Sequence, residues 1–279
     1  MADGAYRWQG HAPAPDAARV EAIHAAYDEA VAHAFAEPAR AAAVERIEQA
    51  LAAARAGDLT EAAGQLTRAR SVLEALDPGA LEPRRGLAGL FDSHGKRLKA
   101  FRETFHRAAA ALSEAAADLT ARVDDAARRS GALDTAWTDV RDAMVELDAY
   151  LLAAARRLSG HGDPDTPHPL KARKAALDAC RAAALGALPL IRGAQNADAR
   201  AAEAIKACHD GVADWRQGWS EALGLAGKRP KKVRPDRERL LRLRDEMVAR
   251  IDRALAELTA SRARRARVES RLSELRAPL

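Results

Sequence analysis

Apolar residues that recur at every seventh position constrain this chain more than any other feature of its sequence. Over residues 98–126 they are Leu98, Phe105, Leu112, Leu119 and Ala126. Further apolar residues fall three or four positions after most of these, which is the spacing of helices that pack along a coiled-coil seam. The same spacing returns over residues 133–158 and 240–275. The sequence therefore predicts long helices that contact one another along narrow apolar stripes.

The amino-acid composition favours narrow seams over one large globular core. Hydrophobic residues make up 48% of the 279 residues, but alanine dominates that share and aromatic residues contribute only 4%. Large cores are filled by bulky side chains, whereas alanine, arginine, glutamate and leucine at helical spacing are typical of long helices. No stretch alternates as a strand would. We predict an all-α fold, an elongated antiparallel helical bundle or coiled coil with long helices, and a helix content above roughly 70%.

Capping and turn residues mark the helix ends in the N-terminal part of the chain. Asp16 is a candidate N-cap for a first helix, which we expect to end at Glu37-Pro38 because proline interrupts helices. Two further helices should follow, the second ending at Gly57 and the third at Asp77-Pro78-Gly79. The turn around residues 56–59 resembles that of a tetratricopeptide hairpin. One such repeat cannot build a solenoid, so an ordinary helical hairpin is the favoured interpretation.

Three segments follow from these boundaries. We predict an N-terminal three-helix segment over residues 1–80, a linker rich in glycine over residues 81–95, and a long-helix coiled-coil domain over residues 96–279. Within that domain, Ser130-Gly131 is expected to end one helix, and the loop from Gly160 to Pro169 to end the next.

Residues 170–225 allow two interpretations. Gly193 and Asn196 favour a turn, which would make the segment a hairpin and bring Cys180 and Cys208 together. However, the apolar rows keep their seven-residue phase through that point, and a turn would normally reset it. We therefore predict one long helix that contains Pro189, with the two cysteines roughly 40 Å apart and no disulfide between them.

Three stretches of the central region carry recognisable motifs. They are Arg84-Arg85-Gly86-Leu87 through Phe91, Leu147-Asp148-Ala149-Tyr150-Leu151 with Ala153-Ala154, and Lys171-Ala172-Arg173 followed by Ala187-Leu188-Pro189-Leu190-Ile191-Arg192-Gly193-Ala194-Gln195-Asn196 and Trp215. In this order the stretches resemble the toxic-anion (tellurite) resistance family, the TelA-like proteins, over about residues 83–275. Two departures mark the chain as a divergent member: Asp214 replaces the proline before the tryptophan, and a basic loop replaces a helical stretch. The N-terminal helices match nothing recognised in the family.

The resemblance implies a role in tellurite or cell-envelope stress, and it brings no catalytic residues. The residues themselves point the same way. The eight histidines form no metal-binding motif, and His161 and His168, which flank two aspartates, fit a solvated loop better than a metal site. Trp215 and Trp219 lie four positions apart, as packing residues in helix interfaces do. We predict no catalytic, cofactor or metal site and no enzymatic activity.

Basic residues near the C-terminus are the best candidates for a charged contact. They are Lys228, Arg229, Lys231, Lys232, Arg234, Arg262, Arg264, Arg265 and Arg267. Such groups attract phosphates or anionic lipid, although a solvated surface is the more common reason for a charge run. The net charge of +5 is too small to indicate nucleic acid by itself.

Three classes of function stay open at this point. The favoured one is a non-enzymatic helical scaffold or protein–protein interaction protein in the stress response to toxic anions or to envelope damage. The second is a peripheral binder of anionic lipid or nucleic acid through the basic C-terminal region, and the third is an enzyme. No signal sequence or apolar span is evident, so we expect a cytoplasmic location, with contact to the inner membrane as an alternative. The partner proteins are not named by the sequence, and a homo-oligomer is left open.

Overall fold

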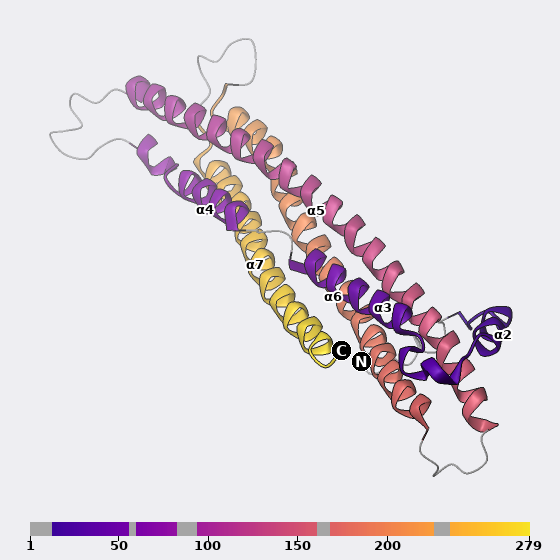
Figure 1. Cartoon of the computed structure of the whole chain (residues 1–279). Coiled ribbons are helices and arrows are strands. Elements are labelled where there is room, and N and C mark those ends of the chain that lie inside the picture. The colour runs from indigo at the N-terminus through magenta and orange to yellow at the C-terminus, as the bar shows by residue number, and fades with distance from the viewer. Residues whose placement is uncertain (1–12, 56–59, 83–93, 161–167, 226–234) are drawn as a thin grey trace. The chain divides into compact units, whose positions relative to one another are not determined.

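A computed structural model describes residues 13–55, 60–82, 94–160, 168–225 and 235–279 of the chain. Helices account for 90% of this part of the chain, and no strand occurs in it, which confirms the predicted all-α fold. Figure 1 shows the helices, which are α2 (Ala17–Ala25), η1 (Glu29–Ala34), α3 (Glu37–Arg55), α4 (Thr60–Glu74), η2 (Pro78–Leu81), α5 (His94–Ser159), α6 (Pro169–Ala222) and α7 (Arg237–Arg276). None of these helices is long and apolar enough to span a membrane.

The sequence predicted where α2 begins, but it did not predict where α2 ends or where α3 begins. Asp16 caps α2 as predicted, because its carboxylate accepts a hydrogen bond from the Ala18 amide at 3.1 Å. The helix ends at Ala25, well before residue 37. The prediction that Glu37-Pro38 ends a helix was wrong: α3 starts at Glu37. Proline is tolerated in the first helical turn, where its missing N–H would have no partner within the helix.

The helix α5 runs without interruption from His94 to Ser159, so the predicted break at Ser130-Gly131 was wrong. Ala126 on one side of the glycine and Leu133 on the other are both buried and lie seven positions apart. The apolar row therefore keeps its phase through Gly131. One glycine inside a helix costs only about 1 kcal/mol relative to alanine, less than the burial of the flanking row contributes.

The helix α6 is continuous from Pro169 to Ala222, which confirms the long helix and rejects the hairpin. Pro189 lies inside it, with its ring on the exposed side. Cys180 and Cys208 are both buried and both free, as the prediction of a single helix requires.

Replacing Pro189 by alanine should stabilise the protein by about 2 kcal/mol. Proline in a helix interior is about 3 kcal/mol less favourable than alanine, and the greater freedom of the unfolded alanine chain returns less than about 1 kcal/mol. Urea denaturation followed by circular dichroism measures the change. Gly193→Ala in the same helix should raise stability by less than about 1 kcal/mol, since its new methyl group meets Val268 at an ordinary 3.7 Å. A loss of stability in Pro189→Ala would contradict this account.

Contacts within the chain group its residues into two compact units, each made of several segments. Unit 1 holds residues 1–56, 128–197 and 263–279, and unit 2 holds residues 57–127 and 198–262. The helices α5, α6 and α7 each contribute one part to each unit. The division into segments 1–80, 81–95 and 96–279 follows the order along the chain and stays a prediction.

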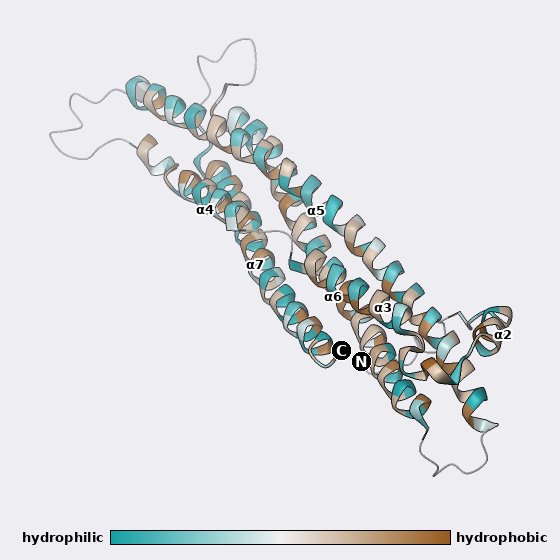
Figure 2. Cartoon of the chain, in the orientation of Figure 1, coloured by the Kyte–Doolittle hydropathy of each residue, from teal (hydrophilic) through white to brown (hydrophobic). Residues whose placement is uncertain are grey.

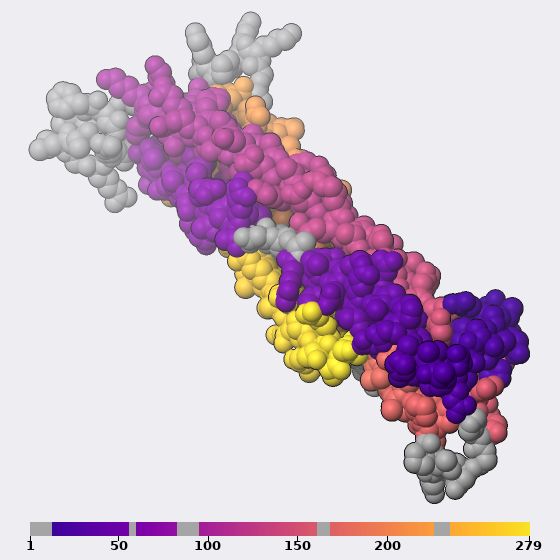
Figure 3. Space-filling model, viewed as in Figure 1, coloured from indigo at the N-terminus to yellow at the C-terminus, as the bar shows by residue number. Residues whose placement is uncertain are grey.

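The core of unit 1 lies where α3 packs against parts of α5, α6 and α7. Figure 3 shows α3 at the surface between α5 and the C-terminal part of α7. The largest cluster of this unit contains Ile47 and Leu51 from α3, Leu133, Val140 and Met144 from α5, Leu188 and Ile191 from α6, and Val268 and Leu272 from α7. Many of the remaining members are alanines, which let neighbouring helices approach closely.

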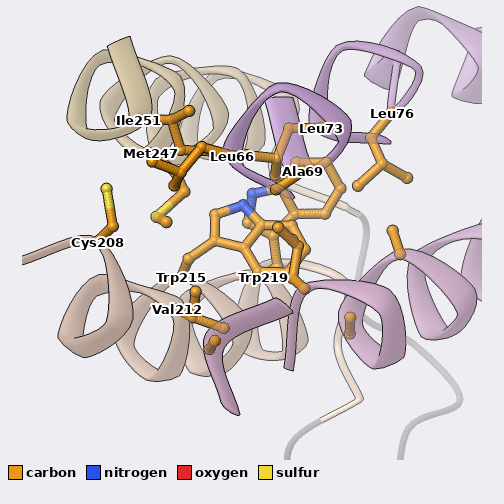
Figure 4. Packing of buried hydrophobic residues seen from close by; sticks show 14 of the residues in the cluster. Leu66, Ala69, Leu73, Leu76, Cys208, Val212, Trp215, Trp219, Met247 and Ile251 are labelled. Carbon is orange, nitrogen blue, oxygen red and sulfur yellow. The ribbon is translucent and has the colours of Figure 1, made fainter. Parts of the chain in front are cut away.

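The core of unit 2 contains most of the aromatic side chains of the protein's buried interior. Figure 4 shows Trp215 and Trp219 of α6 between Leu66 and Leu73 of α4 and Met247 of α7. Phe101 and Phe105 of α5 complete this cluster. Figure 2 shows hydrophilic and hydrophobic residues interleaved along the long helices, as the amphipathic pattern in the sequence predicted.

Candidate functional site

The predicted basic site is only partly within the described residues. Lys228, Arg229, Lys231, Lys232 and Arg234 lie outside them. The four arginines at 262–267 lie on α7, but they do not share one face. Arg262 and Arg267 are exposed and are separated by roughly 140° around the helix axis, and Arg264 is half-buried.

Arg265 is buried and serves the packing of α3 in unit 1. The residue is 7% exposed, and its guanidinium donates a hydrogen bond to the Ala54 carbonyl at 2.8 Å. Ala54 lies in the last turn of α3, where carbonyl groups have no partner within the helix. The positive charge also suits the negative end of the helix dipole. Arg265 is therefore buried and hydrogen-bonded within the protein, so a polyanion cannot reach it.

A groove between α6 and α7 in unit 2 is lined by arginines from both helices. The groove has a volume of about 590 Å³ and is lined by Arg200, Glu203, Ala204, Ala207, Arg250, Arg253, Ala254, Ala256 and Glu257. Four of these residues are alanines, three are arginines and two are glutamates. Arg200 and Arg253 are exposed, while Arg250 is half-buried.

Cys208 of α6 lies close to two of these arginines, Arg250 and Arg253. Cys208 donates its thiol hydrogen to the Arg250 carbonyl at 3.2 Å, so the thiol lies beside the backbone of α7. Burial raises the pKa of the Cys208 thiol to about 11, and the charges of Arg250 and Arg253 oppose that rise. The thiol is therefore protonated and unreactive at neutral pH, and the two guanidiniums are close enough to act on it.

The motif residues of α6 and α5 in unit 1 form a polar network of their own. Arg192 donates to Asp134 at 2.5 Å and to Gln195 at 2.6 Å, and its guanidinium carbon lies 4.3 Å from the centre of the Trp137 ring. Gln195 donates to the hydroxyl and the carbonyl of Ser130, at 3.1 and 3.3 Å. Gln195 of α6 is therefore hydrogen-bonded to α5 at Ser130, the position where we expected the helix to end.

The other motif residues also connect helices of unit 1. Arg181 of α6 pairs with Asp148 of α5 at 2.5 Å. Arg173 donates to the Phe35 carbonyl at 2.6 Å and pairs with Glu37, which Arg40 also pairs with at 2.7 Å. Hydrogen bonds from Arg40 and Arg173 lower the pKa of Glu37 to about 2. Stability from Glu37 is therefore present above its unfolded pKa near 4.5 and is lost as the pH falls towards about 2.

A family model described as "Toxic anion resistance protein (TelA)" matches residues 20–188, more than half of the chain. The chain belongs to this family. No curated protein and no solved structure matches it. The matched range starts in α2 and ends in α6, so the N-terminal helices that the sequence resemblance left out are part of the TelA match. It also ends earlier than the expected residue 275, before the Arg192–Gln195 stretch and Trp215.

The histidines and tryptophans considered in the sequence of this TelA-family chain have no role as metal ligands among the described residues. His168 precedes α6, and its ring nitrogen Nδ1 accepts a hydrogen bond from the Leu170 amide at 3.1 Å. His161 and the aspartates near it lie outside the described residues. Within the described part, no group of three or more metal-binding side chains converges. Trp215 and Trp219 are packing residues, with ring centres 5.3 Å apart.

The arginine groove was missed because no local sequence signal marks it. Arg200 and Arg250 lie fifty positions apart on two helices and belong to ordinary exposed helix faces when each helix is considered alone. Only the register between α6 and α7 places both of them along one groove. The one usable hint is Gly211, a glycine inside a strongly helical stretch, where a side chain from a neighbouring helix comes close.

Proposed function

We propose that this TelA-family chain is a non-enzymatic helical scaffold that binds other proteins in the response to toxic anions or cell-envelope stress. Membership of the family supports the role in toxic anion resistance. The scaffold role is supported by the motif residues, which form ion pairs and hydrogen bonds between helices. Asp148, Arg173 and Arg192 are all engaged in contacts that hold helices together, and side chains committed in this way are positioned for rigidity.

Helices held together in this way offer charged faces to partner proteins. Exposed arginines and carboxylates line α5 and α7, and such faces select partners by charge complementarity. Binding of anionic lipid or nucleic acid through the basic C-terminal residues stays a prediction, and the burial of Arg265 removes one residue from it.

Deleting this chain in its host should increase sensitivity to tellurite or to an envelope stress, and the wild-type chain supplied from a plasmid should restore growth. Affinity purification of the complementing chain should recover the same partner proteins in stressed and complemented cells. Arg271→Gln should restore growth as well as the wild-type chain, because that exposed arginine pairs within its own helix turn, with Glu274. Normal growth of the deletion strain across these stresses would contradict the role. Consumption of tellurite by the purified chain alone would contradict the non-enzymatic part.

A further inference from the structure

A second groove of unit 2 lies between α4 and the part of α5 that belongs to this unit. It has a volume of about 290 Å³ and is lined by Gln65, Arg68, Ala69 and Val72 of α4 and by Ala111, Glu114, Ala115 and Asp118 of α5. These positions follow one another in steps of three and one, so a single face of each helix lines the groove. The volume lies just below the range of roughly 300–1,000 Å³ that is usual for small-ligand pockets, and it suits one long side chain.

Gln65 connects the two helices at this groove. The residue is only 7% exposed, and its Nε2 donates to Oδ2 of Asp118 at 2.9 Å. The carbonyl oxygen Oε1 of the same amide is buried and accepts no hydrogen bond from the residues that the structure describes. Buried acceptors are nearly always satisfied, and one that lacks a donor costs stability. The amide therefore has one open position, which an N–H group that enters the groove would fill.

Two carboxylates of α5 give this side of the groove a negative charge. Glu114 and Asp118 lie four positions apart, so they are neighbours on one face of the helix, with Cβ atoms about 6 Å apart. Both are exposed, and neither forms an ion pair with a residue that the structure describes. Asp118 accepts the Gln65 amide with one oxygen, which leaves its other oxygen open.

The arginine that lines the groove does not neutralise these carboxylates. Arg68 forms no ion pair with a described residue, and its Nη1 would lie 3.9 Å from a Cβ atom placed at Gly64. Its head group therefore lies beside its own helix, one turn before its backbone. The neighbouring charges that face each other across α4 and α5, Glu61 and Arg122, are paired. Within the groove, the negative charge is thus left for a cation from another molecule.

We propose that the α4–α5 groove binds an arginine side chain of a partner protein, a step that rests on the proposed scaffold function. The aliphatic stem of the arginine packs against Ala69 and Val72. Its guanidinium donates to Oε1 of Gln65 and to the carboxylates of Glu114 and Asp118. Arginine suits these three acceptors better than lysine does, because a guanidinium presents five N–H donors in a planar fork.

Peptide binding to the full purified chain tests this assignment. Isothermal titration calorimetry compares capped alanine-based peptides that carry one arginine or one citrulline, which has a similar shape but no charge. The arginine peptide should bind, and the citrulline peptide should bind at least about tenfold more weakly because it lacks charge-assisted hydrogen bonds. Equal binding of the two peptides, or no binding of the arginine peptide at millimolar concentration, would overturn the proposal. Displacement of the arginine peptide by an equal concentration of spermidine would indicate a polyamine site and would also overturn it.

The double variant Glu114→Gln with Asp118→Asn should weaken binding of the arginine peptide by at least about tenfold, because the groove loses both charged acceptors. The matched control, Glu103→Gln with Asp124→Asn, removes the same two charges from exposed positions of α5 outside the groove. It should leave the affinity within about twofold. Circular dichroism verifies that both variants are folded. An equal loss of affinity in both double variants would show that only net charge matters and would overturn the site.

Gln65→Met tests the buried amide separately. The variant removes an acceptor that has no donor and keeps a long side chain of similar shape, so the melting temperature should not fall. Binding of the arginine peptide should nevertheless weaken by about tenfold, because Oε1 is lost. A lower melting temperature with unchanged peptide affinity would show that Gln65 only holds α4 to α5, and would overturn the proposed arrangement.

Different results contradict the groove and the scaffold role. The titrations need no native partner, so an absence of arginine-peptide binding counts against the groove alone. Failure of the wild-type chain to recover any partner protein from its host counts against the scaffold role. If the wild type and Glu114→Gln with Asp118→Asn recover the same partners in equal amounts, the scaffold role stands and the groove is overturned as the contact.

Discussion

Replacing Trp219 by alanine should destabilise the protein by about 3–5 kcal/mol, the range found when a large buried aromatic side chain is removed. Trp219 is fully buried in unit 2. Its ring lies 5.7 Å from Phe105 and 6.1 Å from Phe101, both stacked, and 5.3 Å from Trp215. The change would leave a large cavity among the side chains of four helices, because closely packed neighbours relax only partly into the vacated space.

Urea denaturation followed by far-ultraviolet circular dichroism measures the effect of Trp219→Ala. Trp137→Ala provides the matched control, because Trp137 is only half-buried and contacts Arg192 through its ring face. Loss of that cation–π contact and of partial burial should cost about 1–2 kcal/mol. Equal losses in the two tryptophan variants would contradict the central role of the unit 2 aromatic cluster.

The seven-residue phase of the apolar positions predicted the long helices more reliably than single turn residues did. In α6 the unbroken phase outweighed Gly193 and Asn196, and the helix is continuous. The same phase runs from Ala126 to Leu133 in α5, yet Gly131 was interpreted as a stop. A helix is held by the burial of its whole apolar row, so one unfavourable residue on its exposed side does not end it.

Contacts between distant helices could not be derived in this way. Periodicity shows which face of a helix is buried, but it does not fix the register of α6 against α7. That register depends on particular pairs such as Arg239 with Glu221, at 2.6 Å, and Cys208 with the Arg250 carbonyl. Arg265 illustrates the same limit: its charge suggested an exposed site, and only the position of the α3 end explains its burial.

Reversing the charge of Arg265 should destabilise the protein by at least about 3 kcal/mol, the cost of an uncompensated buried charge. In Arg265→Glu the hydrogen bond to the Ala54 carbonyl is lost, and a carboxylate is placed against the negative end of α3. Arg265→Met removes the positive charge without adding a negative one, so it should cost about 1–3 kcal/mol because the Ala54 carbonyl then lacks its donor.

Arg267→Glu is the matched control for this experiment, since it makes the same substitution two positions away on the exposed side of α7. Its unfolding free energy should stay within about 0.5 kcal/mol of the wild type. Urea denaturation compares the three variants at one pH and salt concentration. If Arg265 were a surface residue that binds polyanions, Arg265→Glu and Arg267→Glu would have similar stabilities and would weaken vesicle or DNA binding to a similar extent. A selective loss of stability in Arg265→Glu instead identifies this arginine as the residue that fastens the end of α3 to α7.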